Sequence, residues 1–70
     1  MTTSDGIVEL LEAGANVTVP AGKPTEKLIE FARIAKRKGV RLTITGAHGK
    51  ATEKLLQIIE AGRGFVDIIL

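Results

Sequence analysis

The chain has 70 residues, of which 44% are hydrophobic and 26% charged, with a formal net charge of +2 and no cysteine. A chain of this length is expected to form one small domain that removes only about 60% of its surface from water, so an isolated copy would be marginally stable. The missing cysteines exclude disulfides, and a single histidine without cysteine excludes a structural zinc site, which leaves self-association as a source of stability.

Two segments of the chain are near copies of each other, GKPTEKLIEF at residues 22–31 and GKATEKLLQI at residues 49–58. A second offset aligns SDGIVELLEAG, residues 4–14, with TEKLLQIIEAG, residues 52–62. Periods of this size are typical of stacked copies of one supersecondary unit. We therefore predict a single domain, residues 1–70, made of three αβ units at about 4–19, 25–45 and 52–70.

Each unit opens with a predicted helix whose first residues are a hydroxyl and an acid. The pairs are Ser4 and Asp5, Thr25 and Glu26, and Thr52 and Glu53. The hydroxyl is expected to cap a free amide and the acid to complement the positive end of the helix dipole, together about 1–2 kcal/mol. Gly14, Gly39 and Gly62 are predicted to end the helices in a left-handed conformation.

The first and third helices are each expected to bury one broad apolar stripe. The stripe residues are Ile7, Val8, Leu10 and Leu11 in the first helix and Leu55, Leu56, Ile58 and Ile59 in the third. The middle helix carries Leu28, Ile29, Phe31, Ala32, Ile34 and Ala35.

Short segments rich in branched residues follow the helices, namely VTV from Val17, LTIT from Leu42 and FVDIIL from Phe65. These segments are predicted strands, and helical crossovers between them favour an α/β fold with a three-stranded parallel sheet. Apolar residues alternate with threonine and arginine in the first two strands, which predicts helices on one face only, in a short solenoid-like layout. In the last strand, Phe65 and Ile69 would project with Asp67 onto the otherwise polar face.

The last strand lacks the features that normally protect the end of a repeat array. Terminal repeats are usually polar and edge strands usually carry proline or lysine, but neither end of this chain is expected to be blunted in that way. We therefore assign self-association, as a closed homo-oligomer or an open filament, to the last strand. The assigned residues are Phe65, Val66, Ile68, Ile69 and Leu70. The alternative is that Phe65 and Ile69 fold back into the chain's own core.

The two Gly-Lys loops favour a second hypothesis, a site for a small anion or phosphate ligand where the three helix starts are expected to gather. The residues assigned to this site are Lys23, Thr25, His48, Lys50 and Thr52. The phosphate-loop pattern is not met, because the residue five before Gly49 is Ile44 rather than glycine. The alternative is that the lysines are solvated side chains on short loops.

Four cations around the end of the middle helix favour a third hypothesis, a basic adaptor that binds nucleic-acid phosphates. These cations are Lys36, Arg37, Lys38 and Arg41. The alternative is a solvated helix end whose cations complement the negative end of the dipole. The lack of Tyr and Trp counts against stacking on single-stranded bases.

The sequence shows no catalytic constellation. Its one serine is the predicted helix cap Ser4, and His48 has no carboxylate or cysteine within three residues. We therefore expect no enzymatic activity, no cofactor and no metal. No segment approaches the roughly 18 apolar residues of a membrane span and no leader-like segment opens the chain, so we expect a cytoplasmic protein without a membrane partner.

Overall fold

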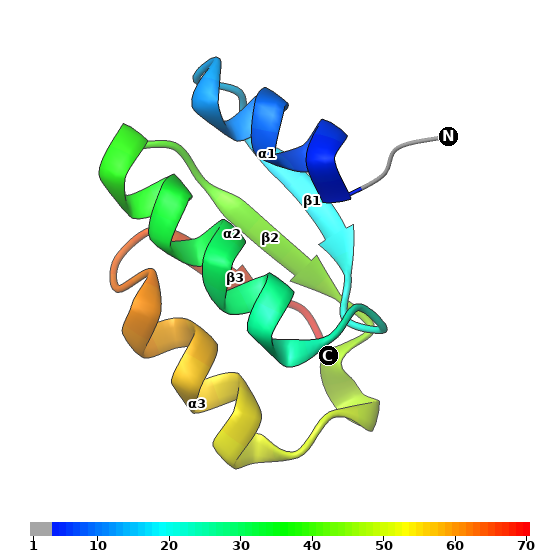
Figure 1. The fold of residues 1–70 in the computed structure, drawn as a ribbon. Helices are drawn as coiled ribbons and strands as arrows, with labels where there is room; N and C mark the ends of the chain where they lie inside the picture. The colour runs from blue at the N-terminus through cyan, green and yellow to red at the C-terminus, as the bar shows by residue number, and fades with distance from the viewer. Residues whose placement is uncertain (1–3) are drawn as a thin grey trace.

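The chain alternates helices and strands, as the sequence predicted. The computed structural model describes the backbone of residues 4–70 and the side chains of residues 6–70, so the cap predicted at Ser4 and Asp5 involves side chains outside the described residues. The elements are α1 (Ser4–Glu12), β1 (Val17–Pro20), α2 (Thr25–Lys38), β2 (Leu42–Thr45), the short 3-10 helix η1 (Ala47–Gly49), α3 (Thr52–Ala61) and β3 (Val66–Ile68). The described residues form a three-stranded parallel sheet, which confirms the predicted α/β class (Figure 1).

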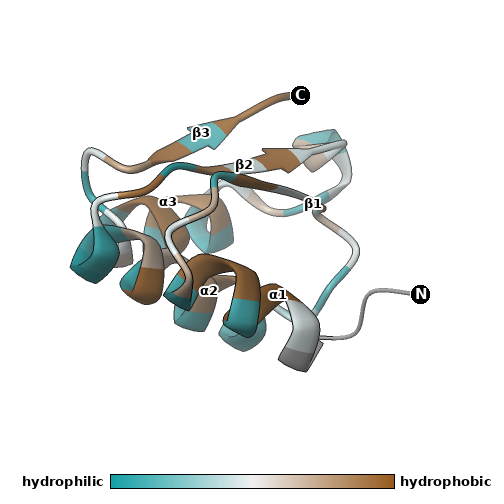
Figure 2. Cartoon of the chain, turned by 90° about the horizontal axis from the view of Figure 1, so that it is seen from above, coloured by the Kyte–Doolittle hydropathy of each residue, from teal (hydrophilic) through white to brown (hydrophobic). Residues whose placement is uncertain are grey.

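The strands lie side by side in their chain order, β1-β2-β3. Val17 pairs with Leu42 and Leu42 pairs with Val66, so successive strands start level with one another. Figure 2 shows the helices covering one face of the sheet while the other face is open. This arrangement confirms the one-sided layout that the alternation of apolar and polar residues predicted.

The core lies between the sheet and the helices, with α2 at its centre. α2 contacts both α1 and α3, and its Phe31 fills the middle of the layer. The largest fully buried side chains are Phe31, Leu11, Leu28, Leu42, Ile44, Ile58 and Val19. Full burial of a side chain of this size stabilises a fold by about 1.5–3 kcal/mol, so this cluster is the main support of the three units.

The hydroxyl caps predicted at Thr25 and Thr52 are wrong. α2 is preceded by Pro24 and α3 by Ala51, and neither cap residue makes a side-chain hydrogen bond to its helix. Pro24 (φ −54°, ψ 141°) and Ala51 (φ −60°, ψ 140°) share nearly the same non-helical backbone conformation. Because the chain turns into each helix one residue earlier than predicted, the threonines are already helical and their hydroxyls do not cap.

Two of the three helices end in a left-handed glycine as predicted, and the third does not. Gly14 and Gly39 have the left-handed φ values of 93° and 72°. Gly62 has a φ of −113°, so the left-handed prediction is wrong there. Its lack of a side chain serves packing instead, because a Cβ on Gly62 would lie 2.5 Å from Val66 Cγ2 and 2.8 Å from Ala32 Cβ. α3 therefore ends in close contact with α2 and β3.

The apolar stripes of α1 and α3 are narrower than predicted. The stripe residues that are buried are Ile7, Leu11, Leu55 and Ile58. Those that remain exposed are Leu10, Leu56 and Ile59. The prediction was too broad because α1 and α3 each pack against α2 on one flank only, whereas α2 has a helix on both flanks.

Candidate functional site

The loops that follow β1 and β2 lie at the end of the sheet where α2 and α3 begin (Figure 1). Lys50 of the second Gly-Lys loop reaches the first loop, because its Nζ donates to Thr25 Oγ1 at 3.2 Å and to the Lys23 carbonyl oxygen at 3.5 Å. The Thr25 hydroxyl, which does not cap α2, thus accepts a bond from the next unit. The two copies of the repeated segment are therefore in direct contact.

An open hollow of about 470 Å³ lies between these loops. Its lining consists of Ala21, Gly22, Thr25, Gly46, Gly49, Lys50, Ala51 and Lys54. Of the residues assigned to the anion site, the structure brings Thr25 and Lys50 into the hollow. Lys23, His48 and Thr52 are not among its lining residues. The sequence analysis did not assign Lys54 to this site. Its position in the first turn of α3, two residues after Thr52, could have indicated that it belongs there.

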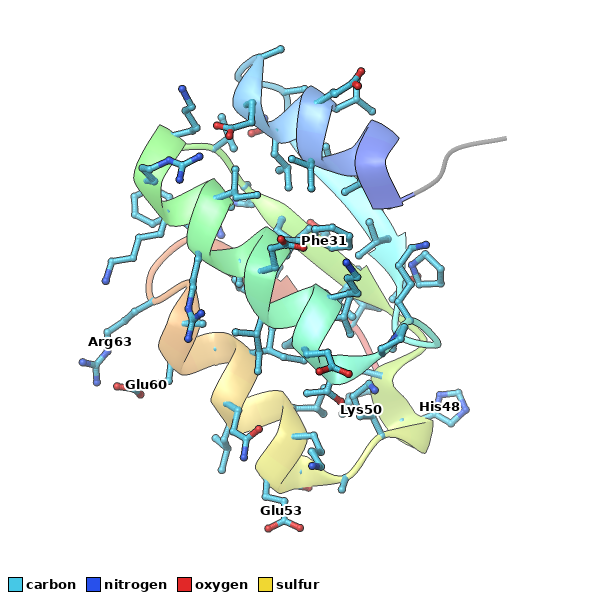
Figure 3. All side chains as sticks on the ribbon, in the orientation of Figure 1. Phe31, His48, Lys50, Glu53, Glu60 and Arg63 are labelled. Carbon is cyan, nitrogen blue, oxygen red and sulfur yellow. The ribbon has the colours of Figure 1, made fainter. Side chains whose placement is uncertain are left out.

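His48 projects outward from η1 and is exposed (Figure 3). Within the described part of the chain, no group of three metal-binding side chains lies together. In the same part, no buried side-chain nitrogen or oxygen lacks a hydrogen-bond partner. None of the helices among residues 4–70 has the length and apolarity needed to cross a membrane.

Two of the cations at the end of α2 are held by a carboxylate on α1. Arg37 donates to Glu12 Oε1 at 2.6 Å, and Lys38 Nζ lies 3.7 Å from the same oxygen. The hydrogen bond from Arg37 and the two positive charges hold the pKa of Glu12 below its ordinary value. Lys36 of the same cluster is exposed. The cluster therefore joins α1 to α2, a role that the sequence analysis did not assign to it.

Arg41, the last cation assigned to nucleic-acid binding, is also engaged within the fold. Its guanidinium donates to Asp67 Oδ1 at 2.8 Å, which joins the segment before β2 to β3. Its backbone amide donates to Asn16 Oδ1 at 2.9 Å. Asn16 thus links the loops before β1 and β2, and the sequence analysis did not single it out because an isolated asparagine in a loop has many possible partners.

The five residues assigned to self-association divide into two groups. Phe65, Val66 and Ile68 are half-buried and pack against the core. Ile69 and Leu70 are exposed, at 53% and 76%. Phe65 therefore folds toward the chain's own core, whereas the last two side chains do not.

β3 is the outer strand at the last end of the sheet. Toward β2, the Ile69 amide donates to the Ile44 carbonyl oxygen at 2.8 Å, and the Phe65 carbonyl oxygen accepts a bond. Because backbone groups alternate sides along a strand, the amides of Val66 and Ile68 lie on the free edge. No proline or lysine blunts this edge, so it is open to an added strand.

β1 forms the opposite edge, and this edge is blunted. The amides of Val17 and Ala21 donate to carbonyl oxygens of the neighbouring segment at 3.0 and 2.9 Å. The alternation therefore places Thr18 and Pro20 outward. Proline has no amide hydrogen and is tolerated in a sheet at such outward edge positions. The expectation that neither end is blunted is thus wrong for β1.

The outer flank of α3 exposes apolar side chains that the sequence analysis assigned to the core. Gln57 and Ala61 face α2, because they line the gap between the two helices. At about 100° per residue, Leu56 and Ile59 lie on the opposite flank. Their side chains are 58% and 38% exposed. The large aliphatic side chains that remain exposed on the last unit are Leu56 and Ile59 on α3 and Ile69 and Leu70 after β3, and we term these four residues the last-unit surface.

Charged side chains lie at both ends of α3. Glu53 is in the first turn, and Arg63 follows the last turn (Figure 3). Arg63 lies 3.7 Å from Glu60, but both side chains are largely exposed, and such pairs contribute only about 0–1 kcal/mol. This pair therefore holds the Arg63 side chain only weakly.

Comparisons with known proteins assign no function. No protein-family model matches the chain, and no curated protein or solved structure is significantly similar to it.

Proposed function

We propose that the protein is a self-associating structural or protein-interaction module whose last-unit surface binds a second copy of the chain, giving a homo-oligomer or a filament. The supporting observation is that four large aliphatic side chains remain exposed on the last αβ unit. Exposed apolar patches on small proteins are typical of protein contact sites. The module is expected to act in the cytoplasm and without a cofactor.

Covering the last-unit surface would supply stability that a chain of this size lacks. Each large aliphatic side chain gains roughly 1.5–3 kcal/mol on full burial. The four side chains are already partly covered, so each would gain a fraction of that amount on association. Because folded domains are stable by only about 5–15 kcal/mol, a gain of this size on association would be a substantial addition to the stability of the chain.

A second copy is the partner that the repeated units favour. α2 covers the inner flank of α3, and β2 covers the inner edge of β3. The outer flank and outer edge of the same unit have no such cover within the described part of the chain. The units of another copy carry matching apolar helix flanks, and the free edge of β3 has no proline to prevent pairing.

Light scattering after size exclusion tests this proposal. The mass of the wild type is expected to exceed the 7.4 kDa of one chain as the concentration rises to high micromolar. Leu56→Lys and Ile59→Lys are each expected to return the mass to one chain, because an ammonium group is costly to bury in a contact. A wild type that keeps the mass of one chain throughout would contradict the proposal.

Leu10→Lys is the matched control for this experiment. Leu10 is 47% exposed on α1, at the other end of the fold. The same change from leucine to lysine there should leave the mass of the oligomer unchanged. Circular dichroism of all variants checks that each one is folded.

A second candidate function is binding of a small anion in the loop hollow. It is supported by the glycines and the two lysines that line the hollow at the start of α3. Lys50 already donates to Thr25 and to the Lys23 carbonyl, so an anion has to compete with these bonds. Titration with inorganic phosphate tests it through the amide signals of Gly22 and Gly49. Saturating shifts below millimolar phosphate would support the site, and unchanged signals would reject it.

A further inference from the structure

One face of α3 carries both the aliphatic and the charged groups of its outer flank. Thr52, Leu56 and Ile59 follow one another at spacings of four and three residues, and Arg63 continues the row four residues later, just past the helix end. Residues at these spacings share one face of a helix. All four side chains are exposed. This row faces away from α2.

The order of groups along this row is self-complementary. When two copies of α3 lie antiparallel about a two-fold axis between Leu56 and Ile59, Leu56 of each copy faces Ile59 of the other. The same axis brings Arg63 of each copy to the first turn of the other, where Glu53 lies. The contact then places aliphatic against aliphatic at its centre and cation beside anion at both ends.

We propose that the second copy binds α3 against α3 in this antiparallel two-fold arrangement, which makes the assembly a closed dimer. The inference depends on the proposed self-association and names its contact. Because a two-fold contact uses the same surface on both copies, assembly stops at two chains. The negative end of each helix dipole also lies beside the positive end of the other, which is favourable.

The first edge of the sheet argues against an open filament. A head-to-tail filament with a continuous sheet would pair β1 of one copy with the free edge of β3 of the next. Pro20 would then lie inside a sheet, where its missing amide hydrogen removes one ladder bond. Among the described residues, α1 also exposes a single large aliphatic side chain, Leu10. The α3 and β3 end of one copy therefore fits the same end of a second copy better than it fits the α1 and β1 end.

Charge reversal tests the contact by sedimentation equilibrium. Glu53→Arg and Arg63→Glu each put like charges at both ends of the homodimer, so each should raise the dimer Kd by about tenfold. A 1:1 mixture of the two variants should recover the wild-type Kd, because one chain then carries arginine at both positions and its partner carries glutamate at both. Glu30→Arg on α2 is the control with the same change of charge, and its Kd should stay at the wild-type value.

The outcomes separate this inference from the proposed function. A raised dimer Kd in each single variant, together with a wild-type Kd in their 1:1 mixture, supports the two-fold contact. If the wild type associates but the Kd of the mixture stays as high as that of the single variants, the two-fold contact is wrong and self-association remains supported. The same conclusion follows if the wild type associates and the single variants have the wild-type Kd. A wild type that does not associate at high micromolar concentration overturns both. Loss of association in Leu10→Lys would point to head-to-tail packing and would also overturn the contact.

Discussion

The two ends of the sheet are built from the same αβ pattern but are finished differently. At the first end, β1 turns Pro20 outward, and Glu12 ties α1 to α2 through Arg37. At the last end, β3 presents an open edge, and α3 exposes Leu56 and Ile59. A repeated sequence can therefore determine the αβ units and how they stack, while the exposed residues at the two ends of the stack differ. Substitutions at the two ends and in the contact between units test this difference.

Gly62→Ala should destabilise the last end by about 1–3 kcal/mol. The added Cβ would lie 2.5 Å from Val66 Cγ2 and 2.9 Å from the Ala32 carbonyl oxygen, which belongs to rigid backbone. Urea unfolding measures the free energy. Gly49→Ala is the matched control, because a Cβ there meets nothing within 4 Å and should change stability by less than about 0.5 kcal/mol. Equal costs for the two variants would show that α3 does not end against α2.

Lys50→Met should lower the free energy of unfolding by about 1 kcal/mol. The reason is that Thr25 Oγ1 and the Lys23 carbonyl oxygen both lose a hydrogen-bond donor in a half-buried loop. Lys23→Met makes the same change in the first copy of the repeated segment, where the backbone carbonyl rather than the ammonium takes part in the contact. Its cost should stay below about 0.5 kcal/mol. Thermal unfolding of both variants measures the difference, and a reversed order would contradict the described loop contact.

Pro20→Val should make the outer edge of β1 open to an added strand, as the outer edge of β3 is. The change adds an outward amide hydrogen to β1 and should alter the stability of the chain by less than about 1 kcal/mol. The expected result is a new population larger than the dimer at high concentration, formed when β1 of one copy pairs with β3 of another. Light scattering detects it, and an unchanged mass distribution would show that Pro20 does not protect the first edge.

Glu12→Gln should have the smallest effect and should appear mainly in the pH dependence of stability. Because the folded-state pKa of Glu12 is lowered, its contribution is present above the unfolded pKa of about 4.3 and is lost as the pH falls below it. Glu12→Gln should therefore lose less stability than the wild type as the pH falls below the unfolded pKa of glutamate and through the lowered pKa of the folded state. Urea midpoints of both proteins across this range measure it, and parallel curves would contradict the assignment.

Much of the fold could be predicted from the sequence, because local rules repeat three times. The offsets between GKPTEKL and GKATEKL revealed the units, and the alternation in LTIT showed which face of the sheet the helices cover. Helix ends at Gly14 and Gly39 followed from the conformational freedom of glycine. These features depend on residues close together in the chain, which is why one sequence was enough to find them.

The features that the sequence did not show depend on neighbours. Whether Leu56 is buried depends on whether a helix lies beyond α3, and the periodicity of one helix cannot report that. Gly62 is required by the approach of Ala32, which is distant in sequence. The bond from Lys50 to Thr25 requires the register between two units. The pairing of Arg41 with Asp67 likewise depends on strand order, which the sequence left open.

The α3–α3 contact can be observed in an isotope-filtered NOE experiment on a 1:1 mixture of carbon-13-labelled and unlabelled protein. We predict intermolecular contacts between the methyl groups of Leu56 and Ile59, with no intermolecular contact to Leu10. Contacts from Leu56 to Leu10 of another copy, or no intermolecular contact at millimolar concentration, would contradict the account.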